Sequence, residues 1–397
     1  MVNIGISVFA ASLLDKMRIA LIAPEKSIHV DRWCEYCLEL GFEVYYIKRK
    51  RGSSVPGIRE VLLPQPCPKF SPQELSEELE ILRDVPEILF HDKVGYAGRL
   101  KTYREILKTI APDVIHSHWV YNTGLNGALA SEGIAPFIQS VWGSDVFIIP
   151  MLKEEKFHEL RQVLSRADMI LGNSRTLVNT ALGFLDSRPG SFVFKWGIKS
   201  YFNPDLYNRE ALREKYGYQP DDVIVLSARG FKPIYNVRNV LRAFYQANRK
   251  NPQLKLILLG EGYEMGNHPI VDNGNVCMMS PVSHRATAEL MALSDISISI
   301  PYSDSMANTL VESLAMNLYL VASDLQPAKE FLKNEVHAVL VNPADVDAIS
   351  DALLSYFDEP HLKEKFRLKS KFIREEFSEE KALNHVKLIY ETVCGKQ

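Results

Sequence analysis

Two acidic residues separated by seven others, Asp304 and Glu312, give the clearest indication of chemistry in this chain. They flank the segment 305–309, which follows an alternating apolar stretch at 295–301 that is typical of a strand. The stretch after it has helical periodicity, and we predict that Asn308 caps this helix and that Glu312 lies in its first turn. Backbone N–H groups at a helix start lack partners within the helix and bind anions such as phosphate.

The two carboxylates have two interpretations. In the first, they bind hydroxyl groups beside a phosphate that is held by the backbone amides of the intervening loop. The residues assigned to that phosphate contact are Ser305, Met306, Ala307, Asn308 and Thr309. In the second, an acid in a first turn only complements the helix dipole. Residue type and spacing leave both interpretations open.

The segment from Asp304 to Asp324 resembles the E-x7-E segment of the retaining glycosyltransferases of family 4, together with the residues that follow it in that family. Two positions depart from the pattern, since Asp304 replaces a Glu and Asn317 replaces a Gly. The resemblance implies an α/β fold of two doubly wound Rossmann-like domains that face each other across a cleft, called GT-B. It also implies that Glu312 holds ribose hydroxyls and that Asp304 holds hydroxyls of the transferred sugar.

Further donor-binding residues are expected in the second half of the chain. Arg229 and Lys232 follow an apolar strand segment at 223–228, and cations at the carboxyl end of a strand suit a diphosphate. In the resembled family this loop supplies an Arg and a Lys, and here Tyr235 stands at the usual Lys position. By the same resemblance, a G-x-G turn and a base-reading segment contribute Gly260, Glu261 and Val282.

His116 and His118 end a predicted strand in the first half of the chain. Alternation sends both imidazoles to one face, which would suit a metal pair, but no third ligand is evident and we expect no metal. The resemblance assigns His118 a catalytic role beside the donor sugar, together with Asp304. The alternative is a hydrogen-bonded histidine at a helix start.

Three residues of the first half are candidates for binding an acceptor. Trp142 suits stacking on a sugar face, and Asp145 suits binding hydroxyl groups. The alternative for these two is a structural corner in which Asp145 caps the turn. His29 follows a loop, 24–28, that is rich in Gly in the resembled family and has none here, so the acceptor class is not predicted.

Length, charge and cysteine usage limit the function classes. At 397 residues the chain is long enough for two domains, and its net charge of −3 gives no reason to expect nucleic acid. Five scattered cysteines do not indicate a disulfide framework, which favours the cytoplasm. No apolar run reaches bilayer length, and the N-terminus lacks the basic start of a signal peptide. The basic run 48–51 leaves contact with an anionic acceptor or with the inner face of the membrane open.

Alternating apolar strands and amphipathic helices predict a parallel sheet in each half, with ligands at the carboxyl ends of the strands. The expected organisation is an N-terminal extension at 1–16, an acceptor-side domain at 17–200, a nucleotide-sugar domain at 201–375, and a helix at 376–397 that returns to the first domain.

The expected activity is retaining transfer of a sugar, a hexose above all, from a nucleoside diphosphate to a glycan, lipid or small-molecule acceptor. UDP-sugars are favoured as donors, and no separate cofactor is expected. Two alternatives remain: a GT-B-like nucleotide-sugar epimerase, and a non-catalytic protein that binds a sugar nucleotide or glycan. The sequence does not predict the oligomeric state.

Overall fold

The structure, a computed structural model, describes residues 17–25, 27–52, 55–260 and 274–395. The chain divides into two compact units. The first contains the residues up to Lys195 and those from Leu383 onward, and the second runs from Trp196 to Ala382. The sequence analysis put the corresponding boundaries at 200 and 375, and its N-terminal extension lies outside the described residues.

The first unit is a parallel α/β domain. Within the described residues its strands are β1 (Arg18–Ile22), β2 (Glu43–Lys48), β3 (Arg59–Leu62), β4 (Val114–His118), β5 (Phe137–Ser140), β6 (Met169–Gly172) and β7 (Gly190–Val193). Its helices are α2 (Ile28–Glu39), α3 (Ser76–Ile81), η1 (Glu87–Leu89), α4 (Lys93–Ile110), η2 (Val120–Gly124), α5 (Leu125–Ala130), α6 (Ser144–Phe147), η3 (Ile149–Met151), α7 (Glu154–Ser165), α8 (Arg175–Leu182) and most of α17 (Glu379–Cys394).

These strands form one sheet in the order β3-β2-β1-β4-β5-β6-β7, and every neighbouring pair is parallel. Apolar side chains of β1, β4 and β5 pack with those of α4, α5 and α7 in one core. The strand order reverses between β1 and β4. Loops after these two strands diverge there, so this is the edge at which a doubly wound sheet binds its ligands.

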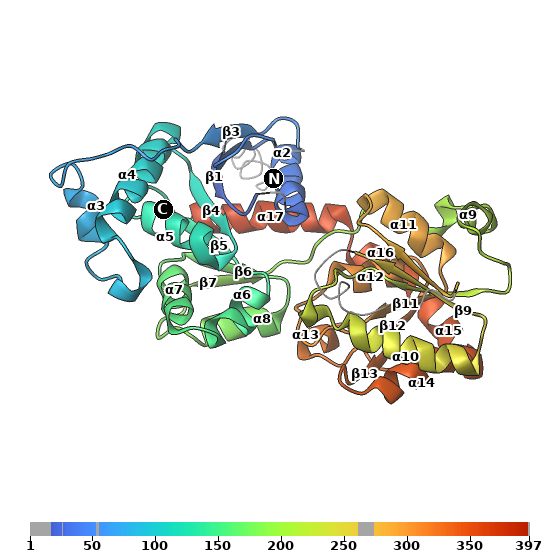
Figure 1. The fold of residues 1–397 in the computed structure, drawn as a ribbon. Coiled ribbons are helices and arrows are strands. Elements are labelled where there is room, and N and C mark those ends of the chain that lie inside the picture. The colour runs from blue at the N-terminus through green and yellow to red at the C-terminus, as the bar shows by residue number, and fades with distance from the viewer. Residues whose placement is uncertain (1–16, 26, 53–54, 261–273, 396–397) are drawn as a thin grey trace, which may run out of the picture. The chain divides into compact units, whose positions relative to one another are not determined.

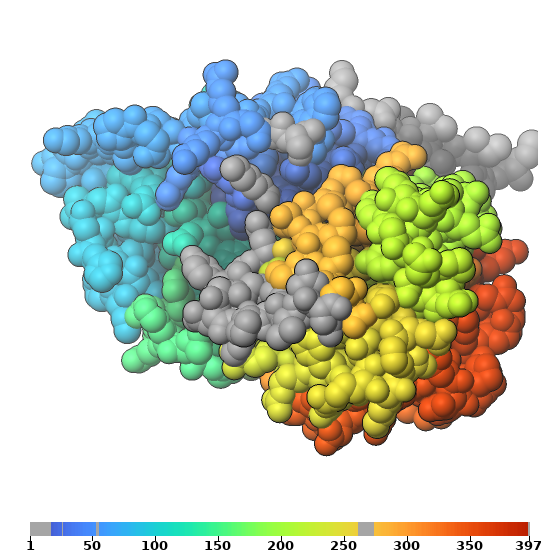
Figure 2. Space-filling model, turned by 45° about the vertical axis from the view of Figure 1, so that its right-hand side comes forward, coloured from blue at the N-terminus to red at the C-terminus, as the bar shows by residue number. Residues whose placement is uncertain are grey.

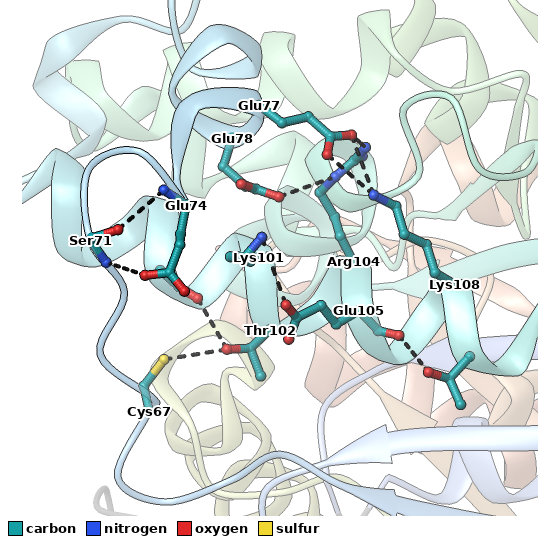
Figure 3. Close-up of polar contacts among 12 residues, drawn as sticks. Cys67, Ser71, Glu74, Glu77, Glu78, Lys101, Thr102, Arg104, Glu105 and Lys108 are labelled. Carbon is teal, nitrogen blue, oxygen red and sulfur yellow. Dashed lines mark hydrogen bonds and ion pairs between the residues drawn. The ribbon is translucent and has the colours of Figure 1, made fainter.

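The segment between β3 and α4 packs on the first core and also contacts one buried arginine. Arg104 of α4 is 4% exposed and donates to the carbonyl groups of Ala130 and Glu132. Its guanidinium also pairs with Glu77 and Glu78 of α3, as Figure 3 shows. Because a buried guanidinium is costly unless it is paired, these contacts help to position α3 on α4.

Helix α17, red in Figure 1, is attached to the first sheet by a buried hydroxyl. The Tyr390 hydroxyl accepts a hydrogen bond from Nε1 of Trp33 at 2.9 Å and lies 2.9 Å from Nδ1 of His116. The other ring nitrogen of His116 lies 2.8 Å from the Ser140 hydroxyl. Burial lowers the His116 pKa well below its usual value, so this imidazole is neutral at pH 7.

The second unit repeats the architecture. In its described part the strands are β8 (Val223–Ser227), β9 (Leu254–Leu259), β10 (Val276–Met279), β11 (Ile296–Ser299), β12 (Tyr319–Ser323) and β13 (Val339–Val341), in the parallel order β10-β9-β8-β11-β12-β13. Its helices are η4 (Pro204–Leu206), α9 (Arg209–Tyr216), η5 (Pro233–Tyr235), α10 (Val237–Lys250), α11 (His284–Leu293), α12 (Asn308–Ala315), α13 (Gln326–Lys329), α14 (Val346–Asp358), α15 (Pro360–Arg367) and α16 (Ser370–Glu376).

Helices cover both faces of this second sheet. Along β8, Ile224 and Leu226 pack with α11 and α12, whereas Val225 packs with α10 and α14. This is the two-residue period of a strand buried on both sides. On the surface of the unit α9 lies beside α11 (Figure 2), and Nζ of Lys215 is 3.2 Å from Oε2 of Glu289. The order again reverses where β8 meets β11.

The first testable prediction concerns the Tyr390 hydroxyl. Tyr390→Phe removes a partner of both Trp33 and His116 while leaving the ring in place. A buried polar group that loses its partner costs about 1–3 kcal/mol, so we expect the variant to lower the free energy of unfolding by about 2–4 kcal/mol. Urea unfolding followed by tryptophan fluorescence measures the change.

Tyr45→Phe is the matched control, because the Tyr45 hydroxyl accepts from the exposed Arg59 at the surface of the same unit. We expect this variant to change stability by less than about 0.5 kcal/mol. Equal effects of the two substitutions would show that the buried hydroxyl does not hold α17.

Candidate functional site

In the second unit, the predicted donor residues meet where the strand order reverses. β8 and β11 are parallel neighbours, so their carboxyl ends lie side by side. Arg229 follows β8 and Asp304 follows β11, and the Arg229 guanidinium pairs with the Asp304 carboxylate through Nη2 and Oδ2. Their side chains are 12% and 21% exposed. A cation and an anion that were predicted for two different parts of a donor therefore bind each other in this structure.

Three further contacts position Arg229. Its guanidinium carbon lies 4.4 Å from the ring centre of Tyr235, a cation–π contact, and Nη1 lies 3.4 Å from the Thr309 hydroxyl. Its Nε is buried without a hydrogen-bond partner among the described residues. Gly260 packs against the Arg229 backbone, because a Cβ at Gly260 would lie 2.8 Å from the Arg229 carbonyl oxygen. Tyr235, which stands at the family's usual Lys position, thus supports the Arg.

The start of α12 differs from the prediction in two details. Ala307, not Asn308, is the N-cap residue, and Asn308 is the first residue of the helix. Glu312 consequently lies beyond the first turn. The backbone N–H of Ser305 donates to Oδ1 of Asp304 at 2.9 Å, while Met306 and Ala307 are buried in the core. The loop is therefore held by Asp304 on one side and by apolar packing on the other.

Glu312 takes part in a hydrogen-bonded chain that the sequence analysis did not anticipate. Oε1 of Glu312 lies 2.8 Å from Nε2 of His284, and Nδ1 of His284 lies 2.8 Å from the Tyr201 hydroxyl. The imidazole also packs on Phe202, with ring centres 4.8 Å apart. Glu312 is 3% exposed, so a partner for its carboxylate is required. The signal in the sequence was weak, a single His one residue after a Ser that caps α11.

The other donor candidates have fewer contacts. Lys232 is exposed, and Val282 is half-buried and packs on the core beside α11. Glu261 lies outside the described residues. Asn317, which replaces the family's Gly, has a φ of 65°, a left-handed conformation that Asn adopts more readily than most residues.

In the first unit, His118 ends β4 at the reversal point. Its ring stacks on His116 with centres 4.5 Å apart, as the alternation predicted. The side chain is 1% exposed, and neither ring nitrogen has a hydrogen-bond partner within the described part of the chain. Burial, and to a lesser extent the nearby His29, lowers the His118 pKa to about 3. A neutral imidazole with two free nitrogens is suited to accept or donate one hydrogen bond to a ligand.

Two predicted acceptor residues lie against His118. The Trp142 ring centre is 6.1 Å from that of His118 and 5.7 Å from that of His29. Trp119, which follows His118, has a φ of 70° and a ring centre 5.8 Å from Trp142. A bulky residue in this conformation is strained, and such strain is concentrated at functional sites. No pattern in the sequence pointed to Trp119.

Asp145 has the contacts of the structural alternative. It is fully buried, and its Oδ1 accepts from the backbone N–H groups of Trp142 and Gly143 at 2.9 Å each. Burial raises its pKa to about 6, although these hydrogen bonds oppose the shift. The carboxylate thus closes the turn after β5 through Oδ1, as in the structural alternative, and its acceptor contact stays a prediction.

A search of the described residues finds no group of three or more His, Cys, Asp or Glu side chains arranged to hold a metal ion. None of the helices in the described ranges is both long and apolar enough to cross a bilayer.

Two protein-family models match the chain. The model described as "Glycosyl transferases group 1" matches residues 208–371, which include Arg229, Asp304 and Glu312. The model "Glycosyl transferase 4-like" matches residues 68–174, which include His118. Both halves of the chain therefore match glycosyltransferase models, and the matched ranges contain the two groups of site residues.

Similar proteins agree with these matches. The putative teichuronic acid biosynthesis glycosyltransferase TuaC of Bacillus subtilis is 22% identical over 267 residues, which are 66% of this chain and 64% of TuaC. Among solved structures, sucrose-phosphate synthase from Thermosynechococcus elongatus has a TM-score of 0.76 at 15% identity, covering 96% of this chain and 100% of that one. Anabaena HepE in complex with UDP-glucose has a TM-score of 0.72 at 14% identity, covering 95% and 99%. The predicted GT-B fold class is confirmed.

The second testable prediction follows from the burial of His118. Its folded-state pKa of about 3 lies below the 6.5 of an exposed histidine, so the unfolded chain binds a proton that the folded chain does not. The neutral His118 stabilises the folded chain fully above pH 6.5, and this stabilisation is lost as the pH falls. The loss of unfolding free energy reaches about 2 kcal/mol at pH 5. We expect His118→Gln to remove that part of the acid sensitivity in urea unfolding between pH 7.5 and 5.

His361→Gln, at a histidine whose side chain is 71% exposed, is the control. The His361 side chain contacts water in both the folded and the unfolded chain. We therefore expect the stability of His361→Gln to depend on pH as that of the wild type does. If His118→Gln also keeps the full wild-type loss at pH 5, the His118 imidazole is accessible to protons in the folded protein.

Proposed function

We propose that this chain is a retaining glycosyltransferase of family 4 that moves a sugar from a nucleoside-diphosphate donor to an acceptor hydroxyl. The second unit binds the donor and the first unit binds the acceptor. The matched family models support the activity, and the site geometry supports the division of roles. The proposed compartment is the cytoplasm or the inner face of its membrane.

One observation carries the proposal: Arg229, Asp304 and the start of α12 meet at the reversal point of the second sheet. A partly buried guanidinium beside the first amides of a helix suits the two phosphates of a donor. We propose that the diphosphate takes Arg229 from Asp304, and that the released carboxylate then binds a sugar hydroxyl. Lys232 adds charge from the exposed side of the loop. In this scheme the cations and amides stabilise the departing diphosphate, and no metal ion takes part.

Glu312 is proposed to bind the ribose of the donor. His284 holds its Oε1, which leaves Oε2 for a ribose hydroxyl. Because His284 is itself held by Tyr201, the carboxylate has one preferred orientation before any ligand binds. His284 and Tyr201 are thus positioning residues for the nucleotide.

The proposed donor is a UDP-sugar. Solved neighbours of similar fold from Anabaena were obtained with UDP, UDP-glucose, or UDP and glucose. We propose the same nucleotide for this chain and leave the sugar to experiment. His118 is proposed to orient the transferring sugar through one of its two unpaired ring nitrogens, beside His29 and Trp142.

The third prediction tests the function directly. The purified chain, incubated with a panel of labelled UDP-sugars, is expected to release UDP and free sugar slowly from one of them, with the donor's anomeric configuration kept in the sugar first released. Chromatography of the products and rapid NMR of the sugar measure this. Formation of an epimeric UDP-sugar would instead identify an epimerase, and tight binding without turnover would identify a binding protein.

The fourth prediction concerns the Arg229–Asp304 pair. Asp304→Asn removes a negative charge that competes with the diphosphate for Arg229. We expect UDP to bind about fivefold more tightly, roughly 1 kcal/mol, because no ion pair has to be broken. Sugar turnover should fall at the same time, since the charged hydrogen bond to the sugar is lost. Calorimetry with UDP and turnover of the UDP-sugar measure the two effects.

Asp351→Asn serves as the control, because Asp351 lies on α14 with its side chain 72% exposed and its carboxylate 3.6 Å from Nζ of Lys250. It removes the same charge without touching the site, and neither quantity should change. Weaker UDP binding by Asp304→Asn would mean that Asp304 supports the diphosphate site instead of competing with it.

A further inference from the structure

Two tryptophans lie together at the carboxyl edge of the first sheet. β4 and β5 are parallel neighbours, and His118 is in register with Ser140. Trp119 directly follows β4, and its backbone N–H donates to the Ser140 carbonyl at 3.0 Å. Trp142 lies two residues after β5, and the two indole rings have centres 5.8 Å apart with an angle of 60° between their planes. Both residues are half-buried, so each keeps part of its surface accessible at the edge where a doubly wound sheet binds its ligands.

Trp119 has a backbone conformation that costs free energy. Its φ of 70° and ψ of 131° lie in a region that residues with a side chain rarely adopt. The Thr123 hydroxyl stabilises this conformation through a hydrogen bond shared between the carbonyl oxygens of His118 and Trp119, at 2.9 and 3.0 Å. Glycine adopts it without strain, so the backbone by itself favours glycine and not tryptophan at this position. An outlier of this kind points to a function for the indole ring.

Polar atoms without partners lie beside these rings. The Trp142 ring centre is 6.1 Å from that of His118. Both ring nitrogens of His118 and Nε1 of Trp142 are buried and have no hydrogen-bond partner in the described part of the chain. A buried polar group in this condition destabilises the protein unless a ligand supplies the hydrogen bond. The group offers an indole N–H donor and an imidazole that donates through one nitrogen and accepts through the other.

The charges beside the rings do not favour an anionic ligand. Oδ1 of Asp145 accepts from the backbone N–H of Trp142 at 2.9 Å. Burial raises the Asp145 pKa to about 6, which leaves the carboxylate mostly ionised at pH 7. Burial also lowers the His118 pKa to about 3, so the imidazole brings no positive charge. An anion here would meet one negative charge and would not be attracted by His118.

These features together favour a carbohydrate over other classes of acceptor. The C–H groups on one face of a sugar ring pack against an indole, while the hydroxyl groups donate and accept hydrogen bonds. A hydrocarbon chain would cover the indole rings but leave the nitrogens of His118 and Trp142 without partners. A small phosphate or carboxylate would leave the indole faces uncovered and lie near the Asp145 charge.

We propose that the acceptor is a carbohydrate whose ring packs on Trp119 and whose hydroxyl groups are bound by Nε1 of Trp142 and by the His118 imidazole. This inference rests on the proposed function, because that function assigns the acceptor to the first unit. It adds the chemical class of the acceptor and a specificity-determining residue, Trp119. One ring nitrogen of His118 then binds the acceptor, and the other binds the transferring sugar.

The experiment follows the indole N–H signals of the four tryptophans by NMR of the full chain, each assigned from a single Trp→Phe variant. The chain is titrated, with and without UDP, with methyl glycosides of glucose, galactose, mannose and N-acetylglucosamine and with maltose. Malate, glycerol 1-phosphate, and diacylglycerol in phosphatidylcholine vesicles represent other acceptor classes. We expect at least one sugar to shift the Trp119 and Trp142 signals saturably. The Trp33 signal should stay in place, because Trp33 is 1% exposed and its Nε1 already donates to Tyr390.

Substitutions at Trp119 test the ring itself. Trp119→Leu keeps an apolar side chain and the same backbone strain but removes the aromatic face. We expect it to weaken binding of that sugar about fivefold or more, as measured from the Trp142 signal, and we expect Trp119→Phe to retain most of the affinity. An unshifted Trp33 signal verifies that each variant is folded. Phe372→Leu is the matched control, because Phe372 is a 58% exposed aromatic residue on α16 of the second unit, and it should bind the sugar as the wild type does.

Each outcome decides the proposal. Saturable shifts of Trp119 and Trp142 by a sugar, weakened in Trp119→Leu, support it. Shifts caused only by malate, glycerol 1-phosphate or the vesicles would identify another class of acceptor and overturn it. Equal shifts of all four signals, no shift with any probe, or full affinity in Trp119→Leu would also overturn it.

UDP affinity is measured by calorimetry on the same wild-type sample. Sugar binding in a chain that does not bind UDP would contradict the donor site alone. UDP binding without any sugar-dependent shift would contradict the carbohydrate acceptor alone.

Discussion

The pairing of Arg229 with Asp304 is the interaction on which the second unit's site depends. Parallel neighbouring strands bring the loops after β8 and β11 together, and the reversal of strand order leaves room between those loops for a ligand. Without a ligand, the cation and the anion satisfy each other, which removes the cost of burying either alone. Gly260 and Tyr235 then hold the Arg from two further sides. Ligand binding at such a site is an exchange of partners for a group whose position is already determined.

Glu312, the second acidic residue of this site, is also held by a protein partner. Glu312 is buried against His284, which in turn contacts Tyr201, so its carboxylate is oriented before a ligand arrives. In the first unit, the candidate site residues are constrained by burial away from water and not by pairing of charges. His116 and His118 are stacked, buried and neutral, and only His116 has hydrogen-bond partners among the described residues. The His118 ring, which has no such partner, therefore lies at the strand end where ligands bind in sheets of this kind.

The two sheets share one plan with different electrostatics. In the second unit, the reversal point carries a guanidinium with its counter-ion, which suits a ligand of high negative charge. In the first, neutral aromatic and imidazole rings lie at the reversal point. Aromatic rings offer a ligand an uncharged contact surface.

The sequence by itself determined the two α/β domains, because alternating apolar strands and amphipathic helices leave few other ways to bury their faces. It also singled out His118, Arg229, Asp304 and Glu312 as candidates, through their place near predicted strand ends and helix starts and through the family resemblance. Only the tertiary structure decided their partners. His284 reaches Glu312, and Arg229 reaches Asp304, across many intervening residues, and no local pattern encodes such contacts. Asp145 became a buried turn closure for the same reason: burial is a property of packing, which residue type and spacing do not specify.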